Sequence, residues 1–388
     1  MNNMANYVQG RIVHDADAHI METQDWLEPY LSGEGADKLN DLYDRAPDFI
    51  REQIEAARQR KGNAEAEAAA AEKLIDGPKG WVAYGAFDPE ERSVALDKMG
   101  FQTQLVFGTF SLGTFTRLDD ETLVYKGARA ANDAMAEFCR KDPRLIYVAY
   151  IPLNNTEKAL DELDRVLAAG AGAIQVSTGP AGDRSPGHVD LDPFWQKLQD
   201  RGVPFVLHIG PGTMTQPSAY HNNGRERAPD IHGGGENLRF PDYIMLSYGP
   251  QIFLTAMVYD GVFERFPRLK GGVIECGAGW VPEFLRELDI SFKSFSKTDP
   301  YLQAMTLTPS EQIRRAVKFT PFPKEDLKRM IDDAGPELFM FSSDYPHPEG
   351  TTDPLGYFEG SIEDLDEAIK DQFYRANFEA MLPWRFAN

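Results

Sequence analysis

The chain has very little cysteine and no hydrophobic stretch long enough to cross a membrane. Only Cys139 and Cys276 occur among its 388 residues, which excludes a disulfide framework and fits a reducing compartment. No run approaches the roughly 18 consecutive apolar residues of a membrane span. The N-terminal MNNMANYVQGR also lacks the apolar core of a signal peptide. We therefore expect a cytoplasmic protein.

Positive charge is also scarce. Forty Lys and Arg residues face 61 Asp and Glu residues, for a formal net charge of −21. Because binding to phosphates needs a basic surface, this balance argues against nucleic acid and against an anionic membrane as partners. We expect the partner to be a small-molecule substrate.

A glycine-rich phosphate loop is missing after the first strand-like run, where the sequence is HDADAHIMET. An open dinucleotide-binding sheet would carry such a loop. The chain instead alternates strand-like and helix-like segments, a pattern typical of a parallel sheet covered by helices. Eight strand-like runs favour a closed (β/α)₈ barrel with insertions. These runs are 11–19, 102–109, 145–153, 171–178, 203–210, 269–277, 317–323 and 338–350.

Two segments interrupt this alternation. Residues 30–80 include the Ala/Glu-rich stretch 58–74, which indicates an exposed helix or a mobile arm. Residues 211–246 are rich in Gly, Pro and Asn, and they are too long for an ordinary loop between a strand and a helix. We expect both insertions to decorate a single barrel domain over 11–388, after an N-terminal tail of residues 1–10.

Ionisable residues stand at the ends of several strand-like runs, where barrel enzymes carry their catalytic groups. Asp17 and His19 end the first run, His208 ends the fifth, and Asp344 ends the eighth. Asp17 and His19 are two positions apart and so share one side of a strand, while Asp15 lies deeper on that side. A buried carboxylate is costly unless it is paired or binds a metal. The four residues therefore predict a site for one divalent ion, which suits Zn²⁺, Mn²⁺ or another divalent ion, and zinc is the ion we expect.

Each of these signals has a structural alternative when taken alone. His208 could be a core histidine with satisfied hydrogen bonds. The SSDYPHP segment could be a turn capped by its aspartate. Their coincidence at the ends of three strand-like runs is what favours a metal site.

The motifs DADAH, VLHIG, GVFERFPRLKGGVIECGAGWVP and LFMFSSDYPHPEG resemble the amidohydrolase superfamily. The resemblance is strongest to the group that includes aminocarboxymuconate-semialdehyde decarboxylase and γ-resorcylate decarboxylase. It implies a metal-centred (β/α)₈ barrel with one divalent ion, commonly zinc, and a homodimer or homotetramer. Asp17 and His19 match the family's first-strand motif, His208 matches its strand-five histidine, and Asp344 its strand-eight aspartate.

One departure from the family concerns strand six. Decarboxylase members commonly carry a catalytic histidine there, and this chain has Cys276 at that position with Glu275 beside it. A thiol with a reference pKa of about 8.5 is a poorer proton carrier at neutral pH. The candidate catalytic residues are therefore Asp344, Glu275 and His347.

Two reactions suit a barrel with one metal ion. The first is non-oxidative decarboxylation of a small carboxylic or aromatic acid, and the resemblance favours it. The second is hydrolysis of an amide, an ester or a carbon–carbon bond. A metal-free binding protein built on the same barrel is the third hypothesis.

Overall fold

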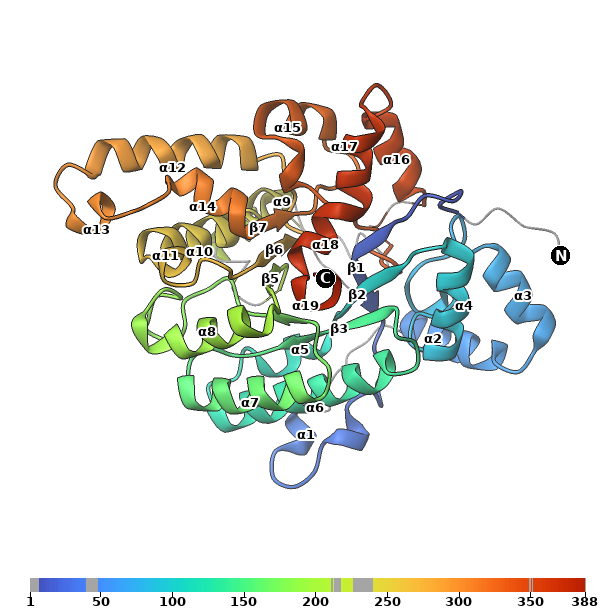
Figure 1. The fold of residues 1–388 in the computed structure, drawn as a ribbon. Helices are drawn as coiled ribbons and strands as arrows, with labels where there is room; N and C mark the ends of the chain where they lie inside the picture. Colours follow the sequence, from blue (N-terminus) through green and yellow to red (C-terminus); the bar gives the residue numbers. More distant parts are fainter. Residues whose placement is uncertain are drawn as a thin grey trace. The chain divides into compact units, whose positions relative to one another are not determined.

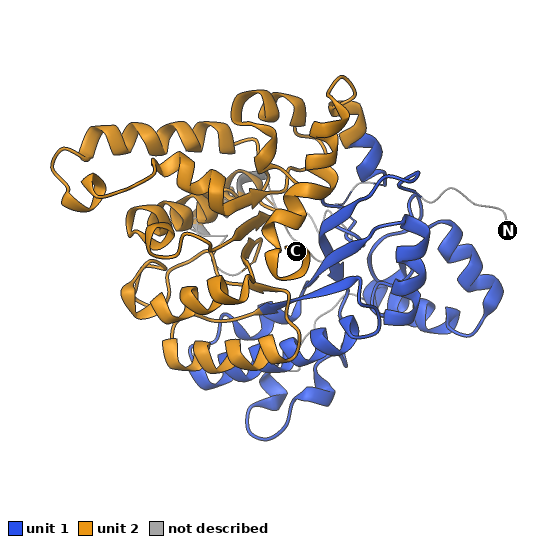
Figure 2. Cartoon of the chain, in the orientation of Figure 1, with its two compact units in different colours: residues 1–149, 227–237, 342–357 blue, residues 150–226, 238–341, 358–388 orange. Residues whose placement is uncertain are grey.

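The computed structural model describes residues 7–39, 48–210, 212, 218–225, 240–348, 350 and 352–387. The chain divides into two compact units, coloured separately in Figure 2. Unit 1 comprises residues 1–149, 227–237 and 342–357, and unit 2 comprises residues 150–226, 238–341 and 358–388. The single domain over 11–388 stays a prediction. None of the described helices combines the length and hydropathy needed to cross a bilayer.

The described residues of unit 1 form three parallel strands that follow each other in chain order, β1 (His14–Ile20), β2 (Thr103–Gly108) and β3 (Leu145–Tyr150). All seven residues of β1 are buried, as in parallel strands that are covered on both faces. The register between β1 and β2 shifts between Asp15 and Ala18. This irregularity lies within the Asp-Ala-Asp-Ala-His segment that supplies the predicted ligands.

Helices α4 (Pro89–Met99), α5 (Ser111–Phe115) and α6 (Glu121–Cys139) connect these strands. Asp88 and Asp120 cap α4 and α6 by accepting hydrogen bonds from backbone N–H groups of the first turn. The N-terminal insertion is also helical, since the Ala/Glu-rich stretch forms the end of one helix and the whole of the next. It contains η1 (Glu28–Tyr30), α1 (Ala36–Leu39), α2 (Asp48–Arg60), α3 (Ala64–Glu72) and η2 (Gly80–Val82).

The described residues of unit 2 form four parallel strands, also in chain order: β4 (Ala173–Gln175), β5 (Phe205–His208), β6 (Gly271–Ile274) and β7 (Val317–Phe319). Figure 1 labels β5, β6 and β7. Its helices up to residue 338 are α7 (Thr156–Ala168), η3 (Val189–Leu191), α8 (Asp192–Arg201), η4 (Ser218–His221), α9 (Phe240–Met245), α10 (Tyr248–Tyr259), α11 (Val262–Arg265), α12 (Val281–Phe295), α13 (Pro300–Gln303), α14 (Pro309–Ala316), α15 (Leu327–Ala334) and η5 (Pro336–Leu338). Most of the predicted insertion at 211–246 lies outside the described residues.

The C-terminal part of the chain is helical after residue 353. It forms α16 (Pro354–Ser361), α17 (Glu367–Asp371), the π-helical η6 (Gln372–Ala376), α18 (Asn377–Met381) and α19 (Pro383–Phe386).

Aromatic packing explains Gly271, the first residue of β6. Phe205 on β5 lies within 5.7 Å of the ring of Trp195 and within 6.4 Å of that of Phe263, measured between centroids. A Cβ on Gly271 would stand 2.3 Å from the Phe205 ring. Only glycine therefore lets β6 pair with β5 at this position.

The structure describes seven regular strands where eight were expected. In the last strand-like run, Phe339 makes an isolated bridge to Phe319 in unit 2, and Tyr345 makes one to Ala18 in unit 1. Asp344 between them has a φ of 56°, which is outside the β region. The run therefore supplies extended segments instead of a continuous eighth strand.

Candidate metal centre

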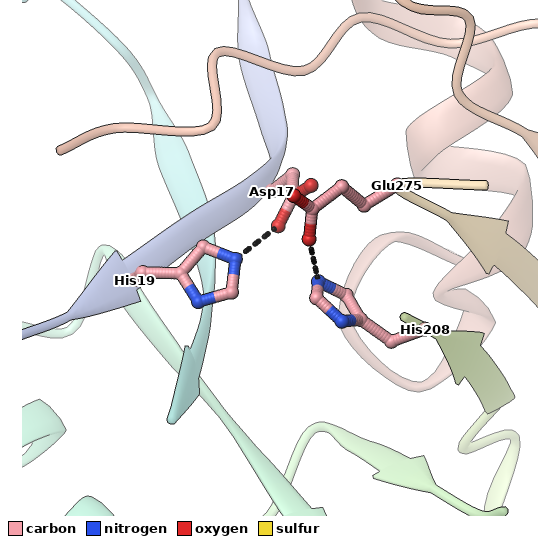
Figure 3. Close-up of side chains that lie close together, drawn as sticks. All are labelled: Asp17, His19, His208 and Glu275. Atoms are coloured by element: carbon pink, nitrogen blue, oxygen red, sulfur yellow. Dashed lines mark ion pairs between the residues drawn. The ribbon is translucent and has the colours of Figure 1, made fainter. Parts of the chain in front are cut away.

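Asp17 and His19 lie on the same side of β1, as the two-residue period of a strand dictates. Both side chains are buried, with about 1% of their residue surface exposed. The Nε2 atom of His19 lies 3.2 Å from Oδ1 of Asp17 (Figure 3) and 3.6 Å from Oδ1 of Asp344. The edge of one imidazole ring therefore faces two carboxylates.

Asp344 is held in place by the backbone of β1. Its N–H donates to the Asp17 carbonyl over 2.9 Å, and the His19 N–H donates to the carbonyl of Tyr345 over 2.7 Å. Its left-handed φ of 56° is rare for a residue with a side chain and is a strained conformation that the surrounding contacts must hold. The two strand contacts fix the carboxylate at the C-terminal end of β1.

His347 completes the group on unit 1. Its ring stacks on that of His19 with 3.9 Å between centroids, and its Nδ1 lies 3.0 Å from Oδ1 of Asp344. Ligand atoms of His19, Asp344 and His347 all lie within 4.8 Å of one another.

The donors on unit 1 suit a divalent cation. Carboxylate oxygens carry only lone pairs, so a proton or a cation must lie between the Asp17 and Asp344 oxygens and the Nε2 lone pair of His19. Imidazole nitrogen with carboxylate oxygen is a common ligand combination for Zn²⁺ and is also compatible with Mn²⁺. The buried donors of β1 therefore fit the metal that the sequence predicts.

Asp15 has a structural role below this group. Its carboxylate accepts hydrogen bonds from the Ser343 N–H (2.8 Å), the Ser343 hydroxyl (2.6 Å) and the Gln104 side chain (2.8 Å). Burial raises the pKa of Asp15 to about 7, although these hydrogen bonds act to lower it. Asp15 thus ties the residue before Asp344 to β1 and β2.

On unit 2, His208 and Glu275 form a second buried pair, also drawn in Figure 3. His208 ends β5 and Glu275 follows β6, and their Nε2 and Oε2 atoms are 3.1 Å apart. His208 Nδ1 lies 2.9 Å from the Ile209 carbonyl, which can only accept, so Nδ1 carries a proton. Glu275 has a φ of 55°, and its N–H donates to the Thr320 hydroxyl.

The predicted site residues thus fall into two groups. Unit 1 brings together Asp17, His19, Asp344 and His347, and unit 2 brings together His208 and Glu275. The neighbouring Cys276 is buried, and it is Glu275 that contacts His208. The complete ligand set stays a prediction.

A protein-family model described as amidohydrolase matches residues 14–384. The chain belongs to this amidohydrolase family. The family resemblance seen in the sequence motifs is confirmed, and the two curated relatives below carry the names of the same two decarboxylases.

This amidohydrolase is 24% identical over 253 residues to 2-amino-3-carboxymuconate-6-semialdehyde decarboxylase of Dictyostelium discoideum, an alignment that covers 64% of each chain. It is 30% identical over 188 residues to γ-resorcylate decarboxylase of a Rhizobium species, covering 47% of this chain and 53% of that one. The matched region thus spans about half to two thirds of these curated relatives.

Solved structures share the fold over almost the whole chain. An amidohydrolase from Mycobacterium avium subsp. paratuberculosis superposes with a TM-score of 0.72 at 22% identity, covering 96% of this chain and 99% of that one. The manganese-bound 5-carboxyvanillate decarboxylase of Novosphingobium aromaticivorans gives a TM-score of 0.65 at 18% identity, with 98% and 99% covered. At these identities the similarity establishes the fold.

Two residues beside the candidate ligands were not predicted from the sequence, half-buried Thr109 and fully buried Glu22. Thr109 follows β2, and its hydroxyl oxygen lies 3.2 Å from Nδ1 of His19 and 2.9 Å from Nε2 of His347. Glu22 follows β1, and its carboxylate accepts hydrogen bonds from the backbone of residues 109–111. The available signal was their position, since both are polar and lie within two residues of the end of a strand.

Proposed function

We propose that this amidohydrolase is a metal-dependent, non-oxidative decarboxylase of a small carboxylic or aromatic acid. The observation that carries the proposal is the Asp344 carboxylate, which is fixed at the end of β1 and contacts both His19 and His347. The names of the curated relatives support this reaction class over hydrolysis.

The ion would be held by Asp17, His19 and Asp344 of unit 1, with His208 as the fourth predicted ligand. We propose Zn²⁺, with Mn²⁺ as the alternative that the manganese-bound neighbour supports. When bound, such an ion supplies Lewis acidity toward the substrate carboxylate.

The chain's own residues supply the proton. Asp344 and His347 share a contact of 3.0 Å, across which one proton can be held. In the proposed reaction this proton is transferred to the substrate carbon that carries the carboxylate. The carbon–carbon bond then breaks, its electron pair stays on that carbon, and CO₂ leaves. A solvent proton then restores the Asp344–His347 pair, so the net reaction consumes one proton and releases CO₂.

A labelling experiment tests the proposal. The purified protein is analysed for metal, then supplied with ortho-hydroxybenzoic and dienoic acids labelled with ¹³C in the carboxylate, in D₂O. We expect ¹³CO₂ and one deuterium on the carbon that lost the carboxylate. Turnover of amides or esters without CO₂ would assign a hydrolase, and full activity in a chelator with no bound metal would contradict the proposed metal centre.

A further inference from the structure

The Thr109 hydroxyl lies at the centre of a three-way contact behind the unit 1 ligands. Its oxygen is 2.9 Å from the Ile20 carbonyl, 3.2 Å from His19 Nδ1 and 2.9 Å from His347 Nε2. It thus contacts the edges of both rings that point away from the Asp344 carboxylate.

Counting protons fixes the direction of each hydrogen bond. A hydroxyl has one proton and two lone pairs, and a carbonyl oxygen can only accept. Thr109 therefore donates its proton to Ile20, and its two lone pairs accept the Nδ1–H of His19 and the Nε2–H of His347. We infer that Thr109 is a positioning residue that fixes the His19 tautomer and the orientation of both histidine rings.

The consequence appears at the opposite edge of each ring. With Nδ1 protonated, the Nε2 of His19 presents its lone pair toward Asp17 and Asp344, as a metal ligand must. His347 presents Nδ1 to the Asp344 carboxylate. One hydroxyl thus orients both the predicted ligand and the histidine that contacts the predicted proton donor.

The backbone of Thr109 is itself held by Glu22. This fully buried carboxylate accepts the N–H groups of Thr109 (3.0 Å), Phe110 (3.0 Å) and Ser111 (3.1 Å) and the Ser111 hydroxyl (2.8 Å). Space around the carboxylate is tight, because a Cβ on Gly108 would stand 3.0 Å from Glu22 Oε1. Thr109 is therefore fixed through its main chain by Glu22 and through its hydroxyl by Ile20.

The effect of Thr109 on metal affinity rests on the proposed function. The experiment therefore tests the role of Thr109 in orienting the histidines separately from the proposed metal centre. Thr109→Val keeps the shape of the side chain and removes the hydroxyl. Thr109→Ser keeps the hydroxyl and removes the methyl group. Thr103→Val is the matched control, because the Thr103 hydroxyl also contacts a buried histidine of β1, His14, over 2.7 Å, but outside the site.

Zn²⁺ affinity is measured on metal-free protein by competition with a fluorescent chelator. We expect Thr109→Val to weaken binding by about 10- to 100-fold, the usual effect of losing a partner of a ligating histidine. Thr109→Ser and Thr103→Val should stay within about threefold of wild type, on the same principle. Wild-type affinity in Thr109→Val would overturn the inference.

A second readout does not depend on activity or on metal. In ¹⁵N-histidine-labelled protein, two-bond ¹H–¹⁵N correlations show which ring nitrogen carries the proton. We expect a proton on Nδ1 of His19 in the wild type, with and without Zn²⁺, and loss of this preference in metal-free Thr109→Val. A His19 protonated only on Nε2 would overturn the inference. A wild type that shows Nδ1–H but binds neither Zn²⁺ nor Mn²⁺ would instead remove the proposed metal centre and leave the role of Thr109 standing.

Discussion

Replacing Glu22 by glutamine tests how the turn that carries Thr109 is held. The Glu22 carboxylate is fully buried and accepts from four donors, three backbone N–H groups and one hydroxyl. Glutamine keeps one acceptor oxygen and turns the other into an NH₂ donor. If the amide oxygen takes the place of Oε1, the NH₂ group faces the N–H of Phe110, which now bonds to Oε2 at 3.0 Å.

The expected destabilisation follows from these contacts. A buried donor left without its acceptor costs about 1–3 kcal/mol, and here both the Phe110 N–H and the new NH₂ group are affected. We therefore expect Glu22→Gln to lower the free energy of unfolding by about 3 kcal/mol. For 388 residues the unfolding entropy is about 0.8 kcal/mol/K, so the melting temperature should fall by roughly 4 °C.

Differential scanning fluorimetry on metal-free protein measures this shift. Glu72→Gln is the control, because it makes the same chemical change at an exposed position at the end of α3 and should change the melting temperature by less than about 1 °C. A Glu22→Gln variant that melts within 1 °C of wild type would refute the argument that the carboxylate satisfies buried backbone donors.

Three further predictions follow from other parts of the molecule. Asp344→Asn keeps an oxygen that can reach a metal but removes the acid. Turnover should therefore fall by about 10²-fold or more while the metal is retained. The control Asp364→Asn, at an exposed position, should match wild type in turnover. Burial lowers the pKa of Lys318 to about 8. Between about pH 8 and 10.4 the unfolded chain therefore holds a proton that the folded chain has lost. The free energy of unfolding should rise by up to about 3 kcal/mol as the pH increases through this window. Lys318→Met should remove this pH-dependent gain in stability. If the difference in melting temperature between Lys318→Met and wild type is the same at all pH values, Lys318 does not contribute the gain. We also propose that the protein forms a homodimer or homotetramer whose interface covers Ile252 on α10 and Phe295 on α12, which are 63% and 62% exposed. A monomer in light scattering at micromolar concentration would contradict this proposal.

The positions of the candidate ligands at strand ends could be predicted because they depend on local rules. Asp17 and His19 share a face because side chains alternate along any strand. Their place at a strand end follows from the apolar run that precedes them. The same reasoning located Asp344 and His208 without knowledge of which strands are neighbours.

The regularity of the last strand-like run could not be predicted this way. The composition of LFMFSSD indicates a strand, but Asp344 adopts a left-handed conformation that a strand cannot continue through. That conformation is imposed by hydrogen bonds to β1, more than 300 residues earlier in the chain.

By itself, the sequence determined the alternating elements, the family and the identity of the candidate ligands, because periodicity and short motifs are properties of neighbouring residues. Only the tertiary structure decided which groups orient those ligands. Thr109 and Glu22 contact their partners across about 90 positions of sequence, through hydrogen bonds from a hydroxyl and from backbone N–H groups. A backbone donor has no signature in the sequence, and a lone threonine or glutamate gains its role only when folding places it beside a particular acceptor or ring.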